Sequence, residues 1–211
     1  PEGTPDAIWL LCQDRALPDV AAVLVRRGLT RVTTLQAAGA LPARIALAAL
    51  AAAGAPVGTL HPICSLRRDQ PRGRLADCVF GVEGDPPARA LALAWIGGQG
   101  HVDLAGLDAE GRVRYHAACA LAGNHLAVLH ARACEAMRSL GLPAPEVERA
   151  IGALMRSALE NLLALGVPRG VSGAAARGDL AALERHAAAL SGPAAELYRS
   201  LSGQLVELLR R

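Results

Sequence analysis

Two polar side chains that could bind a ligand or move a proton share one face of a predicted helix. His116 and Asn124 lie in the stretch 113–140, whose mostly apolar sequence predicts one continuous helix packed on several sides. On such a helix both side chains fall within an arc of about 100° and lie about 12 Å apart along the axis. The other residues in the same arc are small: Ala120, Gly123, Ala127 and Ala131. This stripe is either a close helix contact with its polar groups satisfied internally, or a groove in which an imidazole and a carboxamide orient a ligand.

A third candidate, His61, stands at the end of a predicted strand. The strand is expected to close at Leu60, and Pro62 follows the histidine. Ligands of open α/β sheets bind outside the carboxyl ends of the strands. The imidazole could therefore contact a ligand or transfer a proton near neutral pH, and it could equally cap its own loop.

Two arginine-bearing segments could hold an anion. Arg177 lies between small residues in the glycine-punctuated segment 170–180, where Asp179 is predicted to cap the next helix. A guanidinium at such a helix entrance is a candidate contact for a carboxylate or phosphate. The arginine-rich segment 67–74 could also hold a phosphate, but a solvated basic loop is the favoured reading.

Composition removes several classes of function. The 211-residue chain is 52% hydrophobic and 19% charged with a net charge of +3, which indicates a globular protein. It contains no lysine, so Schiff-base and lysine general-base chemistry are excluded. Aromatic residues are 2% of the chain, which argues against binding of single-stranded nucleic acid. We expect no membrane span, and the lack of a signal peptide at the start of the sequence favours a cytoplasmic protein.

The cysteines and histidines do not predict a metal centre. The five cysteines form no C-x-x-C pair, and no two histidines have H-x-x-x-H spacing. His125 and His130 are interpreted as ordinary helical residues, and the cysteines as reduced, buried thiols. No bound metal is therefore expected.

Alternating strands and helices must position these groups. Short apolar or β-branched runs predict strands, and Ala-rich runs that end at glycine predict helices. This order predicts a parallel α/β sheet, and the all-helical pattern from residue 113 onward predicts a second domain. The expected domains are an α/β domain, 1–108, and a helical domain, 109–211. The predicted strands are 7–12, 31–36, 55–60, 77–84 and 101–104, and the predicted helices of the first domain are 17–27, 42–53 and 87–96.

Several segments in order resemble one family across nearly the whole chain. The chain is similar to Rossmann-like proteins with a C-terminal helical domain of unknown function, DUF2520. The short motifs that carry the resemblance are His61-Pro62, Tyr115-His116 to Asn124, and Arg177-Gly178-Asp179. The longer segments that support it are AIWLLCQDRALPDVA, AAGALP, GTLHPICSL, FGVEGD, YHAACALAGNHL, ALENLLALG and SGAAARGDLAALERHAAAL.

The resemblance implies a relative of the ketopantoate reductase, pyrroline-carboxylate reductase and 6-phosphogluconate dehydrogenase superfamily. Such proteins bind NADP or NAD on the Rossmann domain, and the helical domain completes the substrate cleft and usually forms a homodimer. The resemblance therefore implies that residues 1–108 are a partial Rossmann-like domain and that the helical domain 109–211 serves substrate binding and dimerisation. By this resemblance His116 is the proton donor and Asn124 the oxyanion stabiliser, while His61 and Arg177 bind substrate. The cofactor contacts it implies are Gln13, Asp14 and His61.

The sequence departs from the family in its nucleotide-binding part. It contains no G-x-G-x-x-G motif, and Gly97-Gly98-Gln99-Gly100 has the wrong order because it follows a predicted helix and precedes a strand. The family's first strands and glycine-rich loop would precede Pro1, so we expect a truncated Rossmann-like sheet. Two functions remain open. One is an NAD(P)-dependent oxidoreductase acting on a small carbonyl or imine. The other is a noncatalytic pseudoenzyme that serves as a dimeric scaffold or binds a protein partner.

Overall fold

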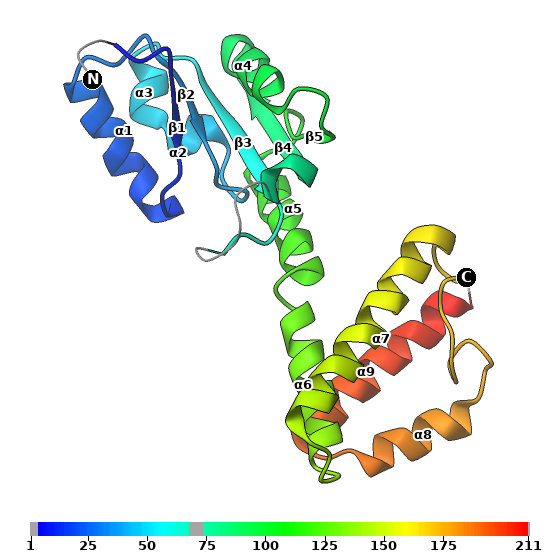
Figure 1. The fold of residues 1–211 in the computed structure, drawn as a ribbon. Coiled ribbons are helices and arrows are strands. Elements are labelled where there is room, and N and C mark those ends of the chain that lie inside the picture. Colours follow the sequence, from blue (N-terminus) through cyan, green and yellow to red (C-terminus); the bar gives the residue numbers. More distant parts are fainter. Residues whose placement is uncertain (1–3, 68–73, 211) are drawn as a thin grey trace. The chain divides into compact units, whose positions relative to one another are not determined.

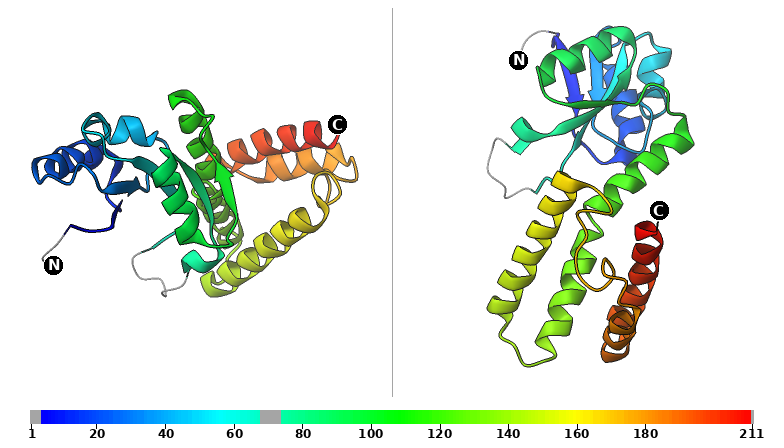
Figure 2. Two further views of the ribbon diagram at one scale, coloured as in Figure 1. Left: turned by 90° about the horizontal axis from the view of Figure 1, so that it is seen from above. Right: turned by 90° about the vertical axis from the view of Figure 1, so that its right-hand side faces the viewer.

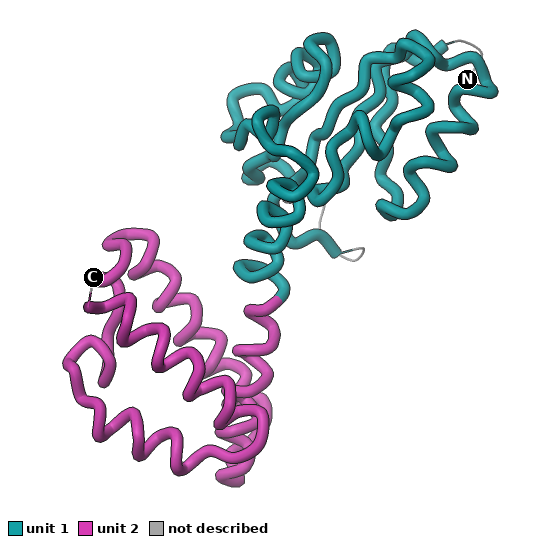
Figure 3. Tube along the Cα trace, turned by 180° about the vertical axis from the view of Figure 1, so that it is seen from behind, with its two compact units in different colours: residues 1–124 teal, residues 125–211 magenta. Residues whose placement is uncertain are grey.

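The chain folds into two compact units with separate cores. A computed structural model describes residues 4–67 and 74–210. Residues 1–124 form the first unit and residues 125–211 the second (Figure 3). Most of the arginine-rich segment 67–74 lies outside the described residues.

A five-stranded sheet forms the centre of the first unit, in the order β1-β2-β3-β4-β5 (Figure 1). All five predicted strands are present, which confirms the α/β fold class. Strands β1 to β3 are mutually parallel, but β4 is antiparallel to β3, and β5 is parallel to β4. The described part of the β3–β4 connection holds only a short 3-10 helix, η2 (Arg74–Asp77), and this part contains no crossover helix of the kind that a parallel return needs. The strands are β1 (Ala7–Leu10), β2 (Thr33–Gln36), β3 (Val57–Ile63), β4 (Val79–Gly84) and β5 (His101–Asp103).

Helices cover both faces of this sheet (Figure 2). Three of them pack on one face, where Leu17, Leu50 and Val57 are almost completely buried. Helix α4 (Pro86–Ile96) packs on the other face, against Leu35 and Phe80. Each face thus buries an apolar layer, as expected for a sheet with helices on both sides. The helices of the first face are α1 (Leu17–Arg26), which follows the 3-10 helix η1 (Asp14–Ala16), α2 (Ala43–Ala46) and α3 (Ala48–Ala52).

The predicted helix 113–140 is two helices, so the prediction of one continuous helix is wrong. Helix α5 (Ala109–Ala122) ends at Gly123, and α6 (Leu126–Arg138) begins three residues further on. Glycine and asparagine are poor helix formers in the interior of a helix, and here they occur together at 123 and 124. The predicted stripe is therefore divided between the two units. The predicted domain boundary after residue 108 stays a prediction; by its contacts, α5 belongs with the sheet.

Four helices make up the second unit. Its small core joins α6 to α7 through Cys134, Val147 and Ile151. The side chain of Asp179 accepts a hydrogen bond from Ala182 N at 2.9 Å, which confirms its role as an N-cap. Among the described residues, no helix is both long and apolar enough to cross a bilayer. After α6 the helices are α7 (Ala144–Leu165), α8 (Leu180–Ala189) and α9 (Gly192–Leu209).

Candidate active site

A fully buried arginine fixes the loop that follows β2. Arg112 of α5 is 0% exposed, and its guanidinium donates hydrogen bonds to the carbonyl oxygens of Ala38 (3.1 Å), Gly39 (2.9 Å) and Leu41 (3.0 Å). It also pairs with the carboxylate of Glu83 at 3.0 Å. A guanidinium has five N–H donors in a rigid fork, which suits it to several acceptors at once. The loop between β2 and α2 is thereby attached to α5 and β4.

Neutral polar side chains complete this buried network. Gln36 Nε2 donates to Leu41 O at 3.0 Å and to Thr59 Oγ1 at 2.7 Å. The Glu83 carboxylate accepts hydrogen bonds from the Thr59 hydroxyl at 2.6 Å and from Ala43 N at 2.8 Å. Burying a polar group is costly unless it is hydrogen-bonded. Because the polar groups around this loop are hydrogen-bonded to one another, they hold the backbone of residues 37–42 in one conformation.

Two histidines and a tyrosine meet beside this loop. His61 Nδ1 lies 2.7 Å from the Tyr115 hydroxyl, and the rings of His61 and His116 are 5.6 Å apart. Both imidazoles approach Gly39. A methyl group at position 39 would lie 2.5 Å from His116 Nδ1 and 3.0 Å from His61 Nε2. The absence of a side chain at Gly39 therefore lets the loop backbone pack directly against both imidazole rings.

A second glycine lets α5 approach the sheet closely enough to place these groups. A methyl group at Gly81 of β4 would lie only 2.6 Å from the Tyr115 hydroxyl and 2.7 Å from Leu104 Cδ1. The strand register sets Gly81 directly opposite His61 on the neighbouring strand. The Tyr115 hydroxyl, which lies against Gly81, can therefore hydrogen-bond to the His61 imidazole. A larger residue at 81 would displace Tyr115 from that position.

The surroundings of His61 and Tyr115 favour their neutral forms. Burial, and then the nearby His116 and Arg112, lower the pKa of His61 to about 4. Burial, and then the neighbouring Cys119, raise the pKa of Tyr115 above its ordinary value. Desolvation penalises the charged form of each group. At neutral pH the pair is thus a neutral imidazole hydrogen-bonded to an intact phenol.

The lowered pKa of His61 predicts that the free energy of unfolding of the first unit decreases as the solution becomes more acidic. In the unfolded chain a histidine takes up its proton below about pH 6.5, whereas folded His61 takes it up only below about pH 4. Between these values the unfolded state binds more protons, so stability falls as the pH falls. His61→Gln has no such proton to bind, and its loss of stability on acidification should be smaller than that of the wild type. Urea unfolding followed by tryptophan fluorescence measures both proteins; parallel pH dependences would contradict the assignment.

The structure corrects the placement of His61. The prediction that the strand ends at Leu60 is wrong, because β3 continues to Ile63 in its antiparallel pairing with β4. The parallel pairing with β2 does stop earlier, at the pair Gln36 and Thr59. His61 therefore lies within β3, just past the carboxyl end of the parallel part of the sheet.

The other predicted site residues are all exposed. Gln13 and Asp14 are exposed between β1 and α1, and Gln13 accepts a hydrogen bond from Arg15 at 2.9 Å. Asn124 is exposed at the end of the first unit, and Arg177 is exposed in the second unit, two residues before the N-cap of α8. The roles of these residues stay predictions, while His61 and His116 are brought together.

Sequence reasoning missed Arg112, Glu83, Gly39 and Tyr115 as parts of this site. Tyr115 and Gly39 lie inside segments that carry the family resemblance, YHAACALAGNHL and AAGALP, so a signal was present for both. Arg112 lies among polar residues at the start of a helix, where an arginine is normally solvated, and nothing in the local sequence marks it as buried.

Comparisons with known proteins agree with this architecture. The model of the family described as "Domain of unknown function (DUF2520)" matches residues 78–205. The sequence matches no curated protein. The fold is similar to that of protein TM1727 from Thermotoga maritima, with a TM-score of 0.78 and 22% identity over 100% of this chain and 81% of that one. It is also similar to the "putative NADP oxidoreductase BF3122" from Bacteroides fragilis (TM-score 0.68, 20% identity, 95% and 74% coverage).

A reductase of known substrate shares the fold at lower similarity. Pyrroline-5-carboxylate reductase from Coxiella burnetii matches with a TM-score of 0.55 and 14% identity, over 97% of this chain and 75% of that one. At these identities the likeness shows a shared fold, the Rossmann-like fold of NAD(P) oxidoreductases followed by a helical part. Fold alone does not assign an activity, which has to be argued from the site.

Proposed function

The chain belongs to the DUF2520 family, and we propose that it is an NAD(P)-dependent oxidoreductase that acts on a small carbonyl or imine. The proposal rests on one observation: His61 and His116 converge on Gly39, with the Tyr115 hydroxyl bonded to His61, just past the carboxyl end of the parallel strands. Open α/β sheets bind their ligands at this edge. The fold shared with oxidoreductases supports the same reading.

The residues at this edge suit the nicotinamide half of a dinucleotide. The backbone at Gly39 packs directly against both imidazole rings, and Gln13 and Asp14 are exposed after the end of β1. We assign these residues and His61 to the cofactor. No residue is assigned to the pyrophosphate, because the sequence contains no G-x-G-x-x-G motif. When bound, a reduced nicotinamide would supply a hydride to the substrate carbon.

The chain itself would supply the proton and the hydrogen bonds. Tyr115 keeps its proton and donates a hydrogen bond to His61 Nδ1, so that the neutral imidazole carries its own proton on Nε2, on the side of the ring that faces Gly39. His61 can then donate a hydrogen bond from Nε2 to the substrate while it keeps its own proton. His116 is exposed and donates the proton that completes reduction of a carbonyl oxygen or imine nitrogen. Asn124 and Arg177 remain proposed substrate contacts that rest on the family resemblance.

We also propose that the helical part forms a homodimer. Helix α7 exposes large apolar side chains, including Leu154 (63%) and Leu163 (79%). An apolar hollow of about 320 Å³ between α6 and α9 is lined by Leu129, Leu197 and Leu201, among others. Exposed apolar surface of this extent marks an interaction surface. The noncatalytic alternative uses the same surface for a second copy or a protein partner.

Titration with NADPH and NADH tests the proposal through Gly39. We expect saturable binding of one of them, weakened at least about tenfold by Gly39→Val, because the side chain would collide with both imidazoles and displace them from the site. Gly106→Val is the matched control, since a Cβ there would have no neighbour within 4 Å. Cofactor fluorescence measures both variants. If neither nucleotide binds to the wild type, the noncatalytic function is favoured. If binding occurs but Gly39→Val leaves it unchanged, the cofactor lies elsewhere.

A further inference from the structure

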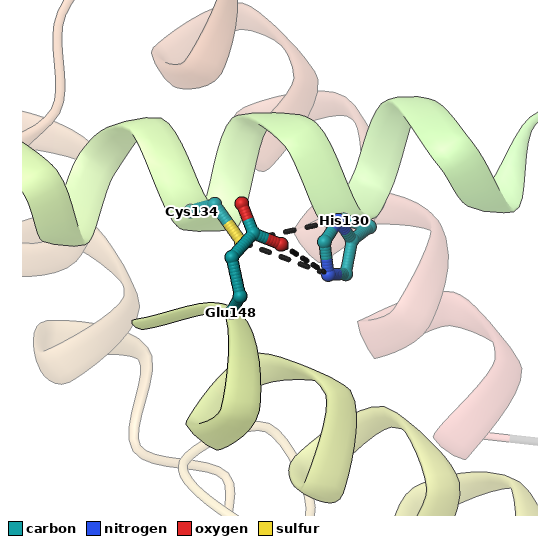
Figure 4. A group of neighbouring side chains, drawn as sticks. All are labelled: His130, Cys134 and Glu148. Carbon is teal, nitrogen blue, oxygen red and sulfur yellow. Dashed lines mark hydrogen bonds and ion pairs between the residues drawn. The ribbon is translucent and has the colours of Figure 1, made fainter. Parts of the chain in front are cut away.

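Three metal-ligating side chains meet between two helices of the second unit (Figure 4). His130 and Cys134 are one helical turn apart on α6, and Glu148 comes from the first turns of α7. Residues at i and i+4 share a helix face, so the imidazole and the thiol point to the same side. The ligand atoms of the three residues all lie within 4.8 Å of one another.

The separations of these atoms match the edges of a zinc tetrahedron. Zn–S bonds of about 2.3 Å and Zn–N or Zn–O bonds of about 2.1 Å at tetrahedral angles place sulfur and nitrogen about 3.6 Å apart, and nitrogen and oxygen about 3.4 Å apart. In the structure His130 Nε2 lies 3.7 Å from Cys134 Sγ and 3.3 Å from Glu148 Oε2. One ion could therefore contact all three atoms with small side-chain adjustments.

The packing around the three residues holds them in place and leaves access for an ion. Cys134 is 1% exposed and packs with Val147 in the core that joins α6 to α7. The side chain of Glu148 is 48% exposed, so one side of the cluster faces solvent. A site between two packed helices is preorganised, which lowers the cost of binding.

Arg138 orients the carboxylate from outside the cluster. Its Nη1 lies 3.2 Å from Glu148 Oε1, and the other oxygen, Oε2, faces His130. Ligating carboxylates are typically held in this way by a second hydrogen-bonding partner. Burial and the Glu148 carboxylate raise the pKa of the Cys134 thiol, and Arg138 opposes this effect. A metal ion would displace the thiol proton, since the thiolate is the form that binds metal.

We propose that His130, Cys134 and Glu148 form a Zn²⁺-binding site that links α6 to α7. Sulfur, imidazole and carboxylate ligands together favour zinc over magnesium or calcium, which prefer oxygen alone. Three protein ligands leave a fourth position for water or another donor. This site is independent of the proposed oxidoreductase activity, and neither proposal depends on the other.

Titration of the reduced 211-residue chain with Co²⁺ tests the site, because cobalt bound to a thiolate absorbs light through charge transfer. We expect one ion per chain, displacement by Zn²⁺, and loss of the absorption in Cys134→Ala. Glu148→Gln should weaken binding at least about tenfold, since even residues that only support a ligand are worth 10–100-fold in affinity. Cys12→Ala and Glu146→Gln are the matched controls, because both residues are exposed and lie outside the cluster.

The outcomes separate a metal site from a cluster of hydrogen bonds and ion pairs. Charge-transfer absorption that Cys134→Ala abolishes and the controls retain supports the site. No saturable absorption in the wild type, or absorption that survives Cys134→Ala, overturns it. If Cys134→Ala does not fold, Glu148→Gln decides the matter, because its half-exposed side chain can be changed without opening the core. Unchanged cobalt affinity in Glu148→Gln would also overturn the proposal.

Discussion

Replacing Arg112 with methionine is expected to lower the free energy of unfolding of the first unit by about 3–5 kcal/mol. Methionine keeps an apolar stem but loses every hydrogen bond of the guanidinium. The change leaves the largely buried Glu83 carboxylate without its cation and Gly39 O without its side-chain donor, while Ala38 O and Leu41 O keep only the hydrogen bonds from Gln36. The cost comes chiefly from these unpaired groups, because leaving a buried charge uncompensated is far more expensive than losing a surface ion pair.

The two tryptophans report this loss selectively. Trp9 and Trp95 are the tryptophans of the chain, and both lie in the first unit with their rings 5.9 Å apart. Denaturant unfolding followed by tryptophan fluorescence therefore measures the first unit without contribution from the helical unit.

A neighbouring arginine provides the matched control. The side chain of Arg114 lies on the same helix but is 75% exposed, in an i,i+4 ion pair with Glu110. Arg114→Met should change the free energy of unfolding by no more than about 0.5 kcal/mol. Equal effects of the two substitutions would show that the buried network does not hold the loop. Adding Glu83→Gln to Arg112→Met should recover part of the loss, since it removes the uncompensated charge.

Local sequence patterns were sufficient to predict the elements of the first unit. The apolar run Ala7–Leu10 and the β-branched run Thr33–Gln36 are strands, because side chains of this kind pack well on a half-buried sheet. Glycine at 28 and at 54 adopts a positive φ just past a helix, as a C-terminal stop requires. These features depend on neighbouring residues, so one sequence can reveal them.

The missed features depend on contacts between residues distant in sequence. The direction of β4 is set by how the chain returns from β3, and composition does not determine it. Arg112 is buried only because the β2–α2 loop, β3 and β4 place acceptors around it. The zinc candidate was missed for a different reason. His130 and Cys134 have the same i,i+4 spacing as H-x-x-x-H, but a pattern of two histidines does not include a His–Cys pair. Glu148 joins the two residues only when α7 packs against α6.

His116 is expected to carry the largest effect on activity. His116→Gln should lower kcat by about 10²–10⁴-fold, the usual contribution of a positioned general acid. Glutamine can still donate a hydrogen bond but cannot deliver a proton at neutral pH. Oxidation of NADPH in the presence of a carbonyl or imine substrate measures the rate. Because His116 is exposed, its replacement should leave the unfolding transition of the first unit nearly unchanged.

The pH profile and a control histidine separate a proton donor from a structural neighbour of His61. A general acid imposes a fall in kcat/KM as it loses its proton, so this limb should disappear in His116→Gln. His101→Gln, at an exposed histidine of β5, should leave both kcat and the profile unchanged. If His116 only supports the His61 ring 5.6 Å away, the variant would keep its alkaline limb and change KM more than kcat. In that case the proton would come from His61 or from solvent, and the low pKa of His61 makes it a weak candidate above pH 6.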